Sequence, residues 1–132
     1  MVKISPISLT MEIEKREIYR GIAEMAYVIA KADRGLSSEE RIAFQKIIED
    51  ELSYDSWAAQ SRFELLDEVT QPSIEKAYNE AIHDFRKYKA YLTEDLKQVS
   101  IRVLQKVANA CSGLSEKEAI ILDRFRKDLK EL

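Results

Sequence analysis

Two stretches of the chain have nearly the same sequence, and they decide the fold. The first reads AKADRGLSSEE from Ala30 to Glu40, and the second reads ANACSGLSEKE from Ala108 to Glu118. Both follow the pattern A-x-A-x-x-G-L-S-x-x-E. Glycine adopts the left-handed conformation that ends a helix, and a serine followed three residues later by glutamate forms a capping box that starts the next one. Each stretch therefore predicts a helix, a short turn and a second helix.

The rest of the chain also favours helices. Apolar residues recur at steps of three and four, and the 132 residues include only three Gly and two Pro, whereas all-β proteins need frequent tight turns. The length is that of one ordinary domain. We predict one all-α domain over residues 1–132, a compact bundle of about six helices with an internal pseudo-repeat of a helical hairpin.

The predicted boundaries follow from capping residues and apolar periodicity. The repeat units span about 11–52 and 93–132, after the N-caps Thr10 and Thr93, and two helices of about 55–69 and 72–90 link them, the second opened by Pro72. The predicted core positions lie on one stripe of each helix: Ile18, Ile22, Met25, Ile29, Ala32, Ala43, Phe44, Ile47, Ile48, Leu52, Ala58, Phe63, Leu65, Leu66, Val69, Ile74, Tyr78, Ala81, Phe85, Tyr88, Leu96, Val99, Val103, Val107, Ala110, Ile121, Leu122, Phe125, Leu129 and Leu132.

The charge and the composition indicate where the protein is located and which classes of partner it binds. The net charge of −3 disfavours a nucleic-acid-binding protein, and we interpret the basic clusters at 86–89 and 124–127 as solvated faces near helix ends. No apolar run approaches the roughly 20 residues that span a bilayer, so no membrane insertion is expected. The first eight residues are too polar for a signal peptide, and a single cysteine forms no intrachain disulfide. We expect a cytoplasmic protein.

The usual catalytic groups are nearly lacking. The only histidine, His83, has polar neighbours on its helix and is expected at the surface. The only cysteine, Cys111, lies among small residues with no basic neighbour, which favours a buried, inert thiol. The sequence also contains no nucleophile elbow and no glycine-rich phosphate loop. We therefore do not expect an enzyme.

Asp33 is the residue of the first stretch that a helical hairpin does not require. A carboxylate in the last turn of a helix faces the negative end of the dipole, and the second stretch has Cys111 at this position. Together with Glu40 and the nearby Glu39, Asp33 forms an oxygen-rich cluster of the kind that binds Ca²⁺ or another divalent cation. The alternative is a solvent-facing Asp33 that caps locally or pairs with a neighbouring basic residue.

The same residues resemble the motif of the TerB-like family, named for a tellurite-resistance protein, which reads A-D-G-x-[I/L]-S-x-x-E and usually occurs twice. The first stretch keeps the acid-to-acid spacing of Asp33 and Glu40 with its glycine displaced by one position, whereas the second has lost its acid at Cys111. The resemblance implies a helical, non-enzymatic domain of the stress response whose acidic residues bind metal ions. It carries over to Asp33 and Glu40, and to Glu118 without its partner.

Two functional hypotheses follow from these residues. The first is a cytosolic TerB-like module that binds a divalent cation weakly and acts through protein partners. The second is a metal-free interaction or scaffold domain that forms homo- or hetero-oligomers. Trp57 and Tyr54 lie at the start of the third predicted helix, where they fit either core packing or an interface anchor.

Overall fold

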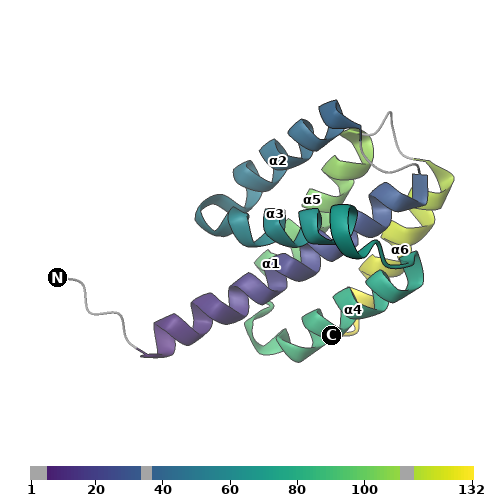
Figure 1. Ribbon diagram of the computed structural model, residues 1–132. Helices are drawn as coiled ribbons and strands as arrows, with labels where there is room; N and C mark the ends of the chain where they lie inside the picture. The colour runs from purple at the N-terminus through teal and green to yellow at the C-terminus, as the bar shows by residue number, and fades with distance from the viewer. Residues whose placement is uncertain (1–5, 34–36, 111–114) are drawn as a thin grey trace.

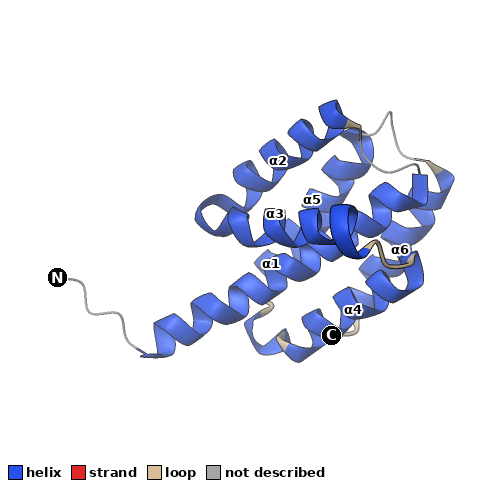
Figure 2. Ribbon diagram, in the orientation of Figure 1, coloured by secondary structure: helices blue, strands red, loops and turns tan. Residues whose placement is uncertain are grey.

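A computed structural model describes the backbone of residues 6–33, 37–110 and 115–132, and the side chains of these residues other than 6–12, 33, 40 and 54. Within these ranges the chain forms six α-helices and no strand (Figure 2), which confirms the predicted all-α bundle. The helices are α1 (Pro6–Asp33), α2 (Ser38–Leu52), α3 (Ser56–Glu64), α4 (Ile74–Lys87), α5 (Glu94–Ala110) and α6 (Glu116–Lys130). Three short segments join them: the 3-10 helices η1 (Ser53–Asp55) and η3 (Lys89–Tyr91), and the π-helix η2 (Leu65–Thr70).

Helix α1 is the centre of the bundle. It runs diagonally through the molecule in Figure 1 and packs against α3, α4, α5 and α6. All ten residues from Gly21 to Ala30 are buried, and nine of them are uncharged. A helix that is apolar on nearly every side has to be covered on every side, so the middle of α1 organises the other helices around it.

Aromatic side chains fill the space between α1 and its neighbours. Phe85 of α4 packs against Phe125 of α6 with ring centroids 5.5 Å apart, and Phe44 of α2 packs against Phe63 of α3 at 4.2 Å. A Cβ atom at Gly21 would lie only 3.3 Å from Cε2 of Phe85. A glycine at this point of α1 therefore allows α4 to approach closely.

Two of the predicted helix caps are present in the structure. Thr93 caps α5 by accepting the Leu96 N–H, and Ser115 forms the predicted capping box at the start of α6. Two other boundaries were wrong. Thr10 lies inside α1, which extends back to Pro6, a residue type that suits the first turn of a helix. Helix α4 begins after Ser73, whose Oγ accepts the Lys76 N–H at 3.2 Å, so Pro72 precedes the cap.

Three predicted core positions are also wrong. Leu65 and Val69 are 44% and 71% exposed, whereas Phe63 and Leu66 face the core. Val69 lies inside the π-helix η2. A π-helix closes its hydrogen bonds over five residues instead of four, so a stripe spaced for an α-helix turns away from the core there. Ala110 is exposed as the last residue of α5.

The internal repeat stays a prediction. Helices α5 and α6 pack against each other, whereas α2 packs mainly against α5 and α3. The turn residues Gly35, Cys111 and Gly113 lie outside the described residues.

No helix in the described part of the chain is long and apolar enough to cross a bilayer.

The capping box of α6 generates the first testable prediction. Replacing Ser115 with alanine removes the Oγ that accepts the Glu118 N–H at 3.1 Å, and loss of such a cap costs about 1 kcal/mol. Urea denaturation should show this loss for Ser115→Ala. Ser61→Ala, at an exposed position inside α3, should stay within about 0.5 kcal/mol of the unmodified chain. Equal effects of the two substitutions would contradict a role for the cap.

Candidate functional site

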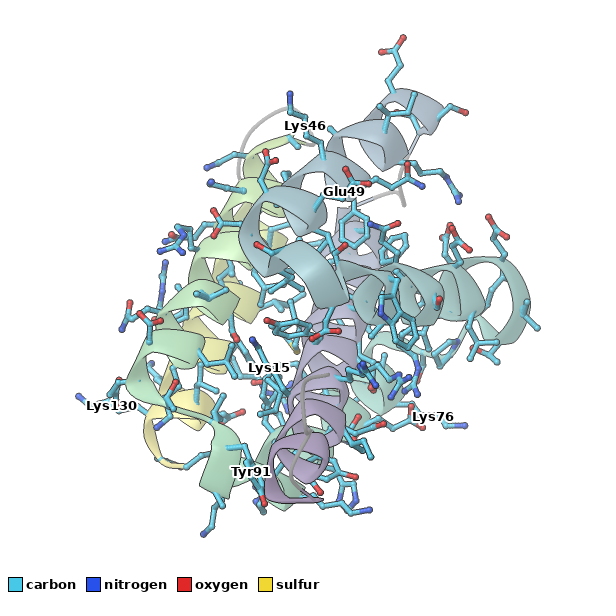
Figure 3. The ribbon with its side chains drawn as sticks, turned by 90° about the vertical axis from the view of Figure 1, so that its left-hand side faces the viewer. Lys15, Lys46, Glu49, Lys76, Tyr91 and Lys130 are labelled. Atoms are coloured by element: carbon cyan, nitrogen blue, oxygen red, sulfur yellow. The ribbon has the colours of Figure 1, made fainter. Side chains whose placement is uncertain are left out.

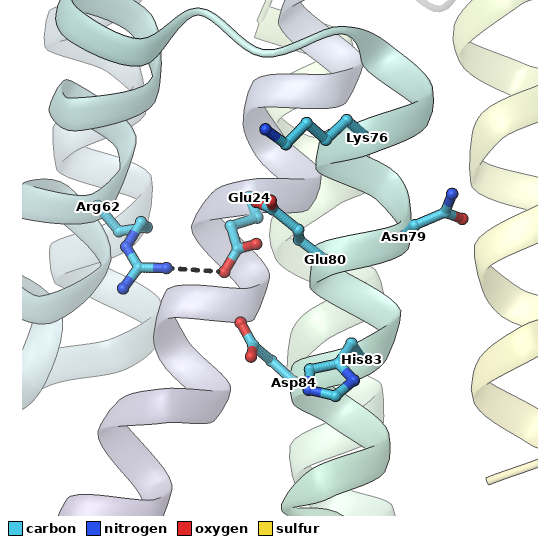
Figure 4. Close-up of a pocket in the computed structure, with 7 residues that line it drawn as sticks. All are labelled: Glu24, Arg62, Lys76, Asn79, Glu80, His83 and Asp84. Atoms are coloured by element: carbon cyan, nitrogen blue, oxygen red, sulfur yellow. Dashed lines mark hydrogen bonds and ion pairs between the residues drawn. The ribbon is translucent and has the colours of Figure 1, made fainter.

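A pocket of about 540 Å³ lies where α1, α3 and α4 meet. Its lining is rich in charged groups, and Figure 4 shows the side chains as sticks. The lining residues are Glu24 of α1, Arg62 of α3, and Lys76, Asn79, Glu80, His83 and Asp84 of α4. Three helices that are distant in sequence therefore contribute to one polar site.

Glu24 is the deepest of these residues. Its side chain is 1% exposed, and its Oε1 accepts a hydrogen bond from Nη1 of Arg62 at 3.1 Å. Its other oxygen, Oε2, is buried and meets no donor among the described residues. A buried carboxylate oxygen without a donor is strongly unfavourable, so this side chain needs either a proton or a ligand.

The surroundings of Glu24 favour its protonated form. Burial, a hydrogen bond to Asp84 and the negative charge of that residue together raise the pKa of Glu24 to about 9, while Arg62 opposes the shift. Two neighbouring carboxyl groups hold a proton between them more tightly than either would alone. The carboxyl group of Glu24 is therefore in its protonated form at neutral pH.

The α4 side of the pocket is built by helical spacing. Lys76, Glu80 and Asp84 follow one another at intervals of four residues, which places them along one face of α4. Figure 4 shows Asp84 and Arg62 reaching toward Glu24 from opposite sides, while Asn79 points away. The face of α4 that lies over Glu24 therefore carries both signs of charge.

A second pocket, of about 560 Å³, provides a contrast. It lies between α1, the end of α2 and the start of α5, with Tyr19, Leu52, Tyr91 and Val99 in its walls. Glu51, one of the two acids in its lining, is paired on both oxygens, with Arg102 at 2.8 Å and Lys106 at 2.6 Å. These partners hold the pKa of Glu51 below its usual range. Glu51 is thus satisfied within the protein, and Glu24 is not.

The predicted metal residues lie at the two ends of one turn. Asp33 is the last residue of α1, and Glu39 and Glu40 are in the first turn of α2, where the Glu39 side chain is exposed. The side chains of Asp33 and Glu40 lie outside the described residues, so the divalent-cation site stays a prediction. Among the described side chains, no three His, Cys, Asp or Glu are placed to hold one metal ion.

The structure also describes two of the other residues that the sequence analysis named, His83 and Trp57. His83 is exposed, as predicted, and also lines the Glu24 pocket. Trp57 is 48% exposed, with the guanidinium groups of Arg16 and Arg20 at 5.3 and 5.9 Å from its ring, so core packing is the wrong interpretation for it. The side chain of Tyr54 and all of Cys111 lie outside the described residues.

Sequence reasoning missed the Glu24 site, although a signal for its burial was present. Residues 21–30 read GIAEMAYVIA, a stretch with one charged residue in almost three helical turns. Such a stretch indicates a helix covered on all sides, and its single acid is then expected to be buried. The partners Arg62 and Asp84 had no comparable signal, because only the tertiary packing brings them to Glu24.

Searches against protein-family models, curated proteins and solved structures find no match to this chain. The TerB-like resemblance therefore depends on the short turn motif alone, and the candidate pocket depends on its own geometry.

The protonated Glu24 generates a pH prediction. The folded state keeps this proton up to a pKa of about 9, whereas an ordinary glutamate releases it near 4.5. Between these values the folded state binds more protons than the unfolded state, so the free energy of unfolding falls as the pH rises, by at most about 1.4 kcal/mol per pH unit. Urea denaturation at pH 6, 7 and 8 should show this slope.

Two variants test whether Glu24 causes the change in the free energy of unfolding with pH. Glu24→Gln carries no titratable proton and should lose most of the slope. Glu49→Gln, at an exposed position on α2 (Figure 3), should keep it. A slope that is the same in the unmodified chain and in Glu24→Gln would show that Glu24 does not hold the proton.

Proposed function

We propose that this chain is a non-enzymatic binding domain and that the pocket between α1, α3 and α4 is its ligand site. The single observation that carries this proposal is Glu24 Oε2, a buried oxygen that meets no donor among the described residues and belongs to a residue lining the pocket. Buried polar atoms are normally hydrogen-bonded, and exceptions are often found at functional sites. A ligand with a hydrogen-bond donor would supply the missing partner.

The composition of the pocket supports binding rather than covalent chemistry. The residues that line it are charged, amide or imidazole groups, and they include no hydroxyl or thiol nucleophile. Its volume lies within the roughly 300–1,000 Å³ range of small-molecule sites. The pocket therefore fits a small polar ligand, or one polar group of a larger partner.

The turn between α1 and α2 supports a second candidate function. Asp33 is the last residue of α1 and Glu40 lies in the first turn of α2, so the two residues flank the segment that resembles the TerB-like motif. On this proposal the domain binds Ca²⁺ or another divalent cation weakly through Asp33, Glu39 and Glu40 and serves a stress response in the cytoplasm through protein partners. A metal-free scaffold that forms oligomers is the variant of this proposal without a cation.

A panel of four probes tests these proposals. Calcium chloride, butylammonium chloride, sodium butyrate and adenosine monophosphate are each titrated into the ¹⁵N-labelled chain at constant ionic strength, with amide shifts recorded by NMR. We expect at least one probe to shift the amides around Glu24, Arg62 and Asp84 in a saturable way. That binding should weaken at least tenfold in Glu24→Gln and stay unchanged in Glu49→Gln.

The same titrations separate the two sites. Calcium bound at the turn would shift amides of residues 33–40, and Asp33→Asn would abolish that effect while leaving the pocket unaffected. If no probe shifts the amides that surround the pocket, the pocket is not a ligand site and the first proposal is wrong. If calcium causes no shift at residues 33–40 at millimolar concentration, the second is wrong.

A further inference from the structure

We infer that the pocket binds a primary ammonium group, and that this group donates to the buried Oε2 of Glu24. The inference rests on the proposed function of the pocket and names the chemistry of its ligand. The observations behind it are the arrangement of charges around Glu24, the number of carboxyl groups and the size of the pocket.

The charges around Glu24 leave room for one more cation. Arg62 and Lys76 carry positive charges, and Glu80 and Asp84 carry negative ones, so these four balance while Glu24 is protonated. If a monovalent cation replaces the proton, three carboxylates face three cations and the balance is kept. Arg20, one turn away from Glu24 on α1, is already paired with Glu17 and adds nothing to this balance.

The carboxyl groups match the donors of an ammonium group. A primary ammonium group has three N–H donors and no acceptor. Glu24, Glu80 and Asp84 bring carboxyl groups to the pocket lining. The hydrogen bond from Arg62 occupies Oε1 of Glu24, whereas Oε2 meets no donor among the described residues. Hydrogen bonds between a charged donor and a carboxylate are among the stronger ones in proteins. Oε2 of Glu24 would thus receive the donor that it lacks.

A divalent metal ion fits this pocket less well. Calcium takes six to eight oxygen ligands, and Arg62 already uses one oxygen of Glu24. A charge of +2 would also leave the pocket with a net positive charge beside Arg62 and Lys76. A volume of about 540 Å³ suits an organic group attached to the ammonium, and the aliphatic parts of Arg62 and Lys76 offer apolar contact to it.

The exchange is balanced in atoms and charge. The protonated carboxyl of Glu24 releases its proton to the solvent, and the resulting carboxylate pairs with the ammonium cation, so no covalent bond forms to the ligand. Since one proton leaves for each ligand bound, affinity should rise with pH below the pKa of Glu24, by up to about tenfold per pH unit. The groups that face Glu24 during this change are Arg62, Lys76, Glu80, His83 and Asp84.

Titration with butylammonium at pH 6, 7 and 8 tests the inference, with amide shifts as the readout. We expect saturable shifts around Glu24, Glu80 and Asp84, and an affinity that increases at each step of pH. Tetramethylammonium has the same charge but no N–H donor, so it should bind at least tenfold more weakly. Histidine side chains in general change charge near neutral pH, so His83→Gln serves as a control. The affinity of this variant for butylammonium should still increase with pH.

Variants of the carboxyl groups complete the test. Glu24→Gln should weaken butylammonium binding at least tenfold and remove its pH dependence, and Glu49→Gln should do neither. Glu80→Gln changes an exposed residue, so we expect the variant to fold and to bind butylammonium severalfold more weakly even if Glu24→Gln does not fold.

Three outcomes would overturn the inference. They are equal binding of butylammonium and tetramethylammonium, an affinity that does not change with pH, and binding that survives both Glu24→Gln and Glu80→Gln. If butyrate, adenosine monophosphate or calcium binds the pocket instead and depends on Glu24, the proposed binding function holds and the ammonium inference is wrong. If none of the probes binds the pocket, both are wrong.

Discussion

Complete burial of the middle of α1 is the constraint on which the rest of the structure depends. Ten consecutive residues, from Gly21 to Ala30, are removed from water. One helix cannot cover another on all sides, so α3, α4, α5 and α6 each take one part of the surface of α1. Gly21 lets Phe85 of α4 come close, and this approach also carries Asp84 of α4 toward Glu24. The packing of the core and the geometry of the pocket thus have the same origin.

Two opposing influences act on the protonation of Glu24. Arg62 donates to Oε1 and favours the carboxylate, but the Arg62 side chain is 31% exposed and part of its charge is screened by solvent. Burial and Asp84 favour the protonated form, and together they are the stronger influence. Because desolvation often outweighs the attraction within a buried ion pair, a single arginine at the edge of the pocket does not ionise Glu24. A second cation, delivered by a ligand, would change that result.

Local features of this protein could be predicted from the sequence, and non-local ones could not. The capping box of Ser115 and Glu118 involves four neighbouring residues, and the stripe of Tyr78, Ala81 and Phe85 needs only the helical period, so both were predicted correctly. The π-helix at Leu65–Thr70 leaves no mark on apolar periodicity, and Val69 was therefore misplaced. Glu24 and Asp84 lie on different helices, and their pairing depends on how α4 packs against α1, which no periodicity encodes.

The two candidate sites share α1 but have different physical origins. Glu24 and Asp33 are nine residues apart, about 14 Å along a helix axis, which exceeds the Debye length of about 8 Å at physiological salt. Their charges therefore influence each other weakly, and a ligand at one site would leave the other nearly unchanged. The pocket is held by the packing of three helices and is formed before any ligand arrives. A site at Asp33 would instead depend on the end of one helix and the turn that follows it. Of the two, the pocket has the geometry of a preorganised site, which a ligand can enter without reordering the chain.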